Sequence, residues 1–102
     1  MLDLELENKR IDLLYDIEVN KSKISATEKK ILALQQDIDD YINVINQIHK
    51  GESDIDMMTA VNHLYEDLEE VDTLQKVKVR CETIINNSQY KLDHILDDYV
   101  EI

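Results

Sequence analysis

The sequence predicts an all-α fold, a long antiparallel helical hairpin of coiled-coil type that dimerisation or a partner's helices complete into a bundle. Isoleucine recurs at every seventh residue from Ile17 to Ile45, and such a repeat forms a seam that is buried only against another helix. The 102 residues include no proline and one glycine, so turns are few and helices are long. Phe and Trp are absent, which favours a narrow interface over a thick core. We therefore expect a single domain spanning residues 1–102.

The first helix is expected over about residues 3–49, with a turn at about 50–53. Gly51 follows the basic Lys50, and glycine is typical of a helix end because it adopts the left-handed conformation without steric cost. With the isoleucines at heptad position a, position d is apolar near both ends of the helix but polar at Asn20 and Thr27. The seam predicted on this helix consists of Leu13, Ile17, Ile24, Ile31, Leu34, Ile38, Tyr41, Ile45 and Ile48.

The second helix is expected over about residues 54–101, because Ser53 followed by Asp56 resembles a capping box. Leu74 and Val77 follow Val71 by steps of three, which predicts a slip of the heptad frame, with local overwinding or a break near Asp72. The seam predicted on this helix consists of Val61, Leu64, Leu68, Val71, Cys81, Ile85, Leu92, Ile95 and Tyr99. Cys81 is interpreted as a small buried residue rather than a reactive thiol.

The short connection between two long helices favours an antiparallel hairpin. Residue i then faces roughly residue 103 minus i, so the polar interruptions of the two helices coincide. Two alternatives are open. Ser25 and Glu28 also have capping-box spacing, so the first helix could break near Ser25 and give three helices. A domain-swapped opening at Gly51 would preserve the same seams.

Basic residues gather near these polar interruptions, and we call them the basic waist, flanked by acidic ends. One interpretation is that these charges set the register between helices or subunits; the other is that they receive an acidic or polar segment of a partner. The basic waist consists of Lys21, Lys23, Lys29, Lys30, Lys76, Lys78 and Arg80.

Further apolar residues widen the stripe beyond positions a and d. A stripe of that width is typical of a bundle of three or more helices, so a second copy of the chain or a partner protein is expected to cover it. The predicted partner surface consists of Leu4, Ile11, Leu14, Ile42, Val44, Ile84 and Val100.

The composition argues against several function classes. A net charge of −12 opposes binding to nucleic acid, and no apolar run is long enough for integral membrane association. His63 and His94 each precede carboxylates by three and four residues, but neither has the Glu-x-x-His spacing of a di-iron bundle. Cys81 has no neighbouring histidine to activate it. We expect a cytoplasmic, non-enzymatic protein without a metal or cofactor.

Two functions fit this architecture. The first is a protein-protein interaction module that holds an amphipathic helix of a partner, as adaptors and chaperones do; the second is a self-assembling coiled-coil subunit or spacer, with a dimer as the expected oligomer. In size, acidity and helical-hairpin form the chain resembles small chaperones of bacterial secretion systems, including those of type III secretion. The resemblance is one of class and involves no shared motif, so it assigns no residue a role.

Overall fold

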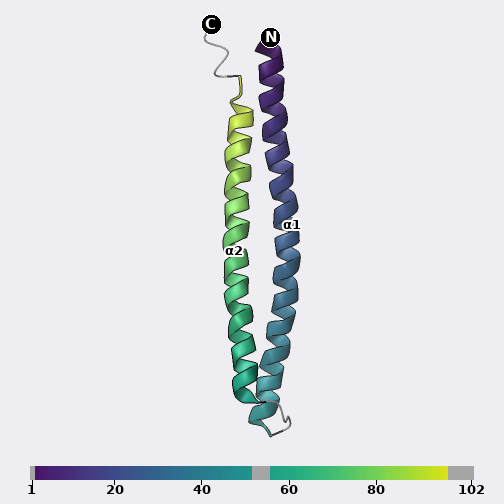
Figure 1. Cartoon of the computed structure of the whole chain (residues 1–102), viewed down its shortest axis with the longest axis vertical. Coiled ribbons are helices and arrows are strands. Elements are labelled where there is room, and N and C mark those ends of the chain that lie inside the picture. Colours follow the sequence, from purple (N-terminus) through teal and green to yellow (C-terminus); the bar gives the residue numbers. More distant parts are fainter. Residues whose placement is uncertain (1, 52–55, 97–102) are drawn as a thin grey trace. The chain divides into compact units, whose positions relative to one another are not determined.

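The computed structural model describes residues 2–51 and 56–96, with side chains from residue 4 onward. These residues form two α-helices and no strand (Figure 1). Helix α1 spans Leu2–His49 and helix α2 spans Met57–Asp93. The predicted all-α helical hairpin is therefore confirmed.

Both helices are continuous at the places where a break was considered. Helix α1 passes Ser25 without interruption, so the three-helix alternative is wrong for the described residues. Helix α2 passes Asp72 in the same way. There the Thr73 hydroxyl donates a hydrogen bond of 3.1 Å to the Glu69 carbonyl. The hydroxyl thus finds its partner within the same helix.

The end of α1 is formed around Gly51. The Lys50 amide donates to the Asn46 carbonyl at 3.1 Å, and the Gly51 amide donates to the Ile48 carbonyl at 3.0 Å. Gly51 has a φ of 75°, a left-handed conformation that costs other residues about 1–2 kcal/mol. The glycine therefore explains why α1 ends at His49, as the sequence predicts.

The start of α2 differs from the expectation of a helix beginning near residue 54. The helix begins at Met57, and the Asp56 carboxylate accepts hydrogen bonds from the Thr59 amide at 3.3 Å and the Thr59 hydroxyl at 3.1 Å. Asp56 is thus the N-cap itself, rather than the third residue of a capping box. Ser53 lies outside the described residues.

The end of α2 also falls earlier than the predicted residue 101. The helix ends at Asp93 and continues as a turn to Leu96. At this end the Tyr90 carbonyl accepts hydrogen bonds from the His94 amide at 3.1 Å and from the His94 ring Nδ1 at 2.8 Å. Tyr99 and Val100, which were expected on α2, lie outside the described residues.

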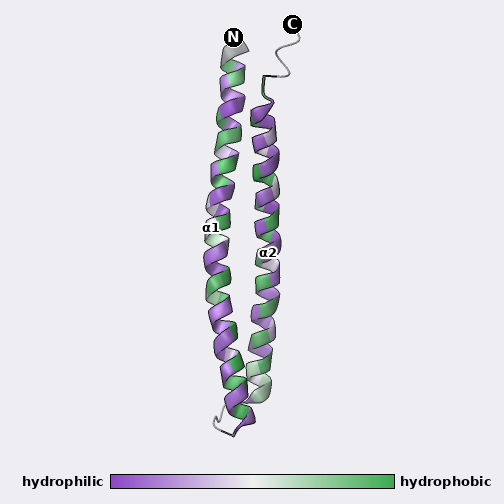
Figure 2. Ribbon diagram, turned by 180° about the vertical axis from the view of Figure 1, so that it is seen from behind, coloured by the Kyte–Doolittle hydropathy of each residue, from purple (hydrophilic) through white to green (hydrophobic). Residues whose placement is uncertain are grey.

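The chain forms two compact units. We call Met1–Ala26 with Lys78–Ile102 the terminal unit, and Thr27–Val77 the turn unit. In each unit, a segment of α1 lies antiparallel beside a segment of α2 (Figure 1). Hydrophobic and hydrophilic residues alternate closely along both helices (Figure 2). This pattern is typical of helices that each bury one narrow row of side chains.

Candidate helix-pairing surfaces

The buried row of α1 follows the heptad of the isoleucines. Ile17 and Ile31 are the most buried of these isoleucines, with 4% and 6% of their surface exposed. Burying an isoleucine side chain contributes about 1.5–3 kcal/mol. All buried or half-buried residues of α1 except Val19 and Val44 occupy position a or d, namely Leu6, Leu13, Ile17, Asn20, Ile24, Thr27, Ile31, Leu34, Ile38, Tyr41, Ile45 and Ile48.

The buried row of α2 keeps one heptad frame over its whole length, so the predicted frame slip is wrong. Position a is taken by residues at seven-residue steps from Met57, and position d by residues at the same steps from Ala60. Position a therefore holds Met57, Leu64, Val71, Lys78, Ile85 and Leu92, and position d holds Ala60, Asp67, Leu74, Cys81, Ser88 and Ile95.

Leu68 is the residue that misled the prediction. It is 44% exposed, whereas the preceding Asp67 is half-buried at position d. The Asp67 Oδ2 atom is buried without a hydrogen-bond partner. A continuous helix cannot rotate by one residue to bury Leu68 without turning its whole row away from α1, so the aspartate takes the inner position. Lys78, which the same frame places at position a, is half-buried beside Val77.

In the turn unit, an aromatic contact fixes the register of the two helices. The rings of Tyr41 and His63 stack with 5.5 Å between their centroids and 13° between their planes. The hairpin register expected from the sequence pairs Tyr41 with Asn62, so the observed partner His63 differs from the expected one by one residue. Extended along the turn unit, this register places Ile45 within one residue of the level of Ala60, which is 2% exposed. Pairing a large with a small residue lets helices approach closely.

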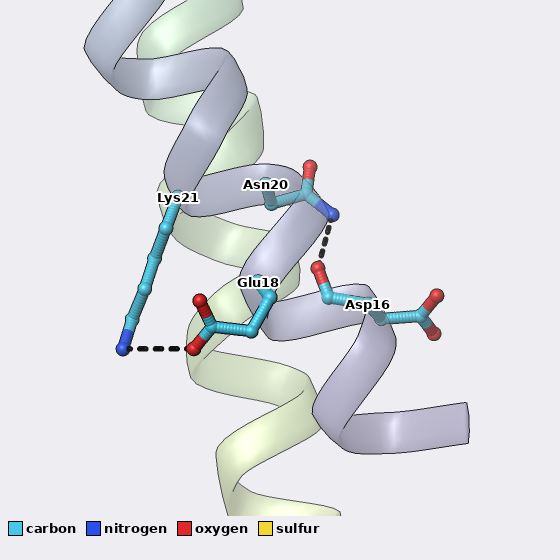
Figure 3. A network of polar contacts seen from close by, with 4 residues as sticks. All are labelled: Asp16, Glu18, Asn20 and Lys21. Atoms are coloured by element: carbon cyan, nitrogen blue, oxygen red, sulfur yellow. Dashed lines mark hydrogen bonds and ion pairs between the residues drawn. The ribbon is translucent and has the colours of Figure 1, made fainter. Parts of the chain in front are cut away.

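The buried rows of the terminal unit include two polar residues and one thiol. Asn20, Cys81 and Ser88 are 6%, 5% and 6% exposed. The Asn20 side-chain amide donates to the Asp16 carbonyl at 2.8 Å (Figure 3), but its Oδ1 atom is buried without a partner. A buried acceptor without a partner costs about 1–3 kcal/mol. The buried rows of this unit therefore include polar groups beside the buried Ile17.

The predicted partner surface is exposed to different degrees. Leu4, Ile11 and Leu14 on α1 are 66%, 53% and 40% exposed, and Ile84 on α2 is 40% exposed. In the turn unit Ile42 is 43% exposed and Val44 is half-buried. The sequence did not single out Leu32, Val79 or Leu96, which are also exposed.

The residues of the basic waist divide between the two units. In the terminal unit, Lys21 pairs with Glu18 of its own helix at 3.7 Å (Figure 3). In the turn unit, Lys76 pairs with Asp72 of its own helix at 3.1 Å. Exposed pairs one helical turn apart contribute about 0.3–0.5 kcal/mol. Apart from half-buried Lys78, all residues of the waist are exposed, and a joint role for them stays a prediction.

Three residues with reactive or metal-binding side chains make contacts within the structure. Cys81 is buried, His63 stacks on Tyr41, and the His94 ring stacks on Tyr90 with 4.2 Å between centroids. Across residues 2–51 and 56–96, no group of three His, Cys, Asp or Glu side chains is close enough to hold a metal ion. The sequence analysis did not predict that His63 stacks on Tyr41, because its register pairs Tyr41 with the neighbouring Asn62.

Neither described helix has a stretch that is long and apolar enough to cross a membrane. Comparisons of the chain with protein-family models, curated proteins and solved structures find no match. The chain's own residues are therefore the basis for inferring its function.

Proposed function

We propose that this chain is a non-enzymatic protein-protein interaction module that binds an amphipathic helix of a partner, as an adaptor or chaperone does. One observation carries the proposal: in the turn unit, Ile42 and Leu68 are 43% and 44% exposed directly beside the buried rows. Both occupy heptad position e, together with half-buried Val61. Each helix thus has an apolar stripe wider than its partner helix covers.

The geometry of the pair supports one binding side. Because the helices run antiparallel, the e positions of both helices lie on the same side of the pair. Ile42, Val61 and Leu68 therefore line one side of the turn unit, where a third helix can lay its own apolar face. A partner helix that buried about 100 Å² of these side chains would gain roughly 2.5 kcal/mol.

The charge of the chain indicates the chemistry of the partner. Its net charge of −12 attracts a segment with basic residues around the apolar stripe and increases the rate of encounter. Cys81 is buried, and His63 and His94 stack on tyrosine rings, which supports a role in binding rather than in catalysis.

A defined peptide tests the proposal. We would label a 20-residue peptide with a leucine stripe and an otherwise basic surface, and measure its binding by fluorescence anisotropy. Replacing Ile42→Gln together with Leu68→Gln is expected to weaken binding at least about tenfold, or ~1.4 kcal/mol. The control pair Leu32→Gln and Met58→Gln changes the more exposed b positions and is expected to leave binding unchanged.

Two results would count against the module. Equal binding of a scrambled peptide with the same composition would show attraction by charge alone. Unchanged binding by the Ile42 and Leu68 variant, with helicity intact by circular dichroism, would show that the e positions are not the site.

The second candidate is a structural subunit that assembles with itself. The continuous heptad rows favour it, because a/d rows of this length also hold coiled-coil spacers together. Thermal unfolding separates the two functions. A chaperone-like module is stabilised by its client through mass action, whereas a structural subunit is stable alone and its melting temperature does not change with the peptide.

A further inference from the structure

We propose that the outer face of α1 between Ile11 and Ala26 pairs antiparallel with the same face of a second copy of this chain. This face lies opposite the buried row and is separate from the e positions of the turn unit. The inference therefore goes beyond the proposed binding of a partner helix and does not depend on it.

The outer face carries a stripe of two large and two small side chains, with Glu18 between them. Ile11, Tyr15, Ser22 and Ala26 follow one another by steps of four, seven and four, so they share one stripe of the helix. Ile11 and Tyr15 are 53% and 68% exposed, so two large side chains lie next to each other on this face. Beside Tyr15 the surface forms a shallow hollow lined by Glu18, Val19, Ser22, Lys23 and Ala26.

The sizes of these residues suit an antiparallel arrangement. The large residues Ile11 and Tyr15 occupy the first half of the stripe, and the small residues Ser22 and Ala26 occupy the second half. A two-fold axis between Glu18 and Val19 places Ile11 opposite Ala26 and Tyr15 opposite Ser22 of the second copy. Large side chains then enter the spaces left by small ones, whereas parallel pairing would set large against large.

The charges beside the stripe favour the same arrangement. Asp12 and Asp16 lie on one flank of its first half, and Lys23 lies on the same flank of its second half. An antiparallel pair faces each Lys23 with Asp12 and Asp16 of the other copy, because the same flank of both helices then lies on one side of the pair. Such complementarity selects orientation and register more than it adds affinity. Charge and size thus specify the same occupant, a second copy of this chain.

Sedimentation equilibrium of the full chain tests for the dimer. The unchanged chain is expected to sediment as a dimer at about 50 µM, a concentration suited to weak helix pairing. Ile11→Gln with Tyr15→Gln is expected to raise the dissociation constant at least about tenfold. The control Leu32→Gln with Tyr65→Gln alters similarly exposed residues of the turn unit and should leave it unchanged. A monomer at this concentration, or equal effects of the two variants, would overturn the proposal.

A charge exchange tests the partner residues directly. Asp12→Lys with Asp16→Lys makes the flank wholly basic, and Lys23→Glu in a separate chain makes it wholly acidic. Each variant alone should be monomeric with unchanged helicity, and an equimolar mixture should regain a dimer. If the mixture stays monomeric while both variants are folded, or if each variant alone still dimerises, the proposed pairing is wrong.

Cross-linking gives the orientation. In a Cys81→Ala background, a short bismaleimide should link two chains through Val19→Cys, which lies near the two-fold axis, and not through Leu4→Cys, which lies far from it. Linking at both positions would indicate a parallel pair and overturn the antiparallel assignment. A positive result here together with no peptide binding would reject the proposed function and leave the self-pairing in place.

Discussion

At the scale of single residues, Asn20 is the weakest point of the buried row of α1. Its Oδ1 atom is buried without a partner, while its amide nitrogen bonds within its own helix (Figure 3). Replacing Asn20→Leu removes this uncompensated polar atom and adds apolar surface to the row. We expect a gain of about 1–2 kcal/mol in the free energy of unfolding, measured by urea denaturation.

Asn43→Leu is the matched control for this substitution, because Asn43 is exposed on the same helix. It is expected to change stability by less than about 0.5 kcal/mol. A loss of stability in Asn20→Leu would instead indicate that the asparagine holds the register of the pair, a use known for single polar residues in coiled coils.

At the scale of the element, the frame of α2 determines which side chains carry its stability. Leu68 is 44% exposed, whereas Asp67 occupies position d with one oxygen buried and unpaired. Leu68→Ala should therefore cost less than about 1 kcal/mol, and Asp67→Leu should stabilise the protein by about 1–2 kcal/mol. Thermal and urea unfolding of both variants measure these effects. A cost of about 2–5 kcal/mol for Leu68→Ala is the mark of a core leucine and would support the slipped frame.

The beginning of α2 depends on one carboxylate. Asp56 accepts two hydrogen bonds from Thr59, so Asp56→Ala is expected to destabilise the chain by about 1 kcal/mol in urea denaturation. Asp56→Asn keeps an acceptor oxygen and should lose much less. Equal losses in the two variants would attribute the effect to the negative charge near the helix N-terminus rather than to the hydrogen bonds.

At the scale of the whole molecule, the division into two units predicts two opening equilibria. The boundaries fall at Ala26 and Thr27 on α1 and at Val77 and Lys78 on α2. The polar interruptions of the heptad rows lie in this part of the sequence. The turn unit includes the connection that closes its ends, while the terminal unit buries Asn20 and Ser88 in its rows. We expect the terminal unit to open more often.

Thiol labelling measures this difference. Cys81 reports on the terminal unit because it is buried and must be exposed before it reacts. Ala60→Cys in a Cys81→Ala background reports on the turn unit, because Ala60 is 2% exposed. Cys81 should react at least about tenfold faster under native conditions, corresponding to ~1.4 kcal/mol, and the two thiols should react equally in concentrated urea. Equal native rates would mean that the units open together.

Some features of this protein follow from the sequence because they depend on local chemistry. The repeat of Ile17, Ile24 and Ile31 defines the inner face of α1, since a helix brings every seventh side chain to one side. Gly51 defines the end of that helix, since the left-handed conformation there is strained for other residues. Polarity at Asn20 and Thr27 is likewise evident from the heptad.

The phase of α2 was decided by tertiary structure. Judged alone, Leu68 is a better core residue than Asp67, and its choice leads to a false frame slip. In the structure, Ala60, Cys81 and Ser88 lie in the same buried row as Asp67. One continuous helix has a single phase, so the summed contacts of its whole row outweigh the cost of one buried aspartate. The sequence by itself determined the helices, the inner face of α1 and much of the inner face of α2. Only the pairing of the two helices decided that Ala60, Asp67 and Lys78 lie in the row of α2 and that Leu68 does not.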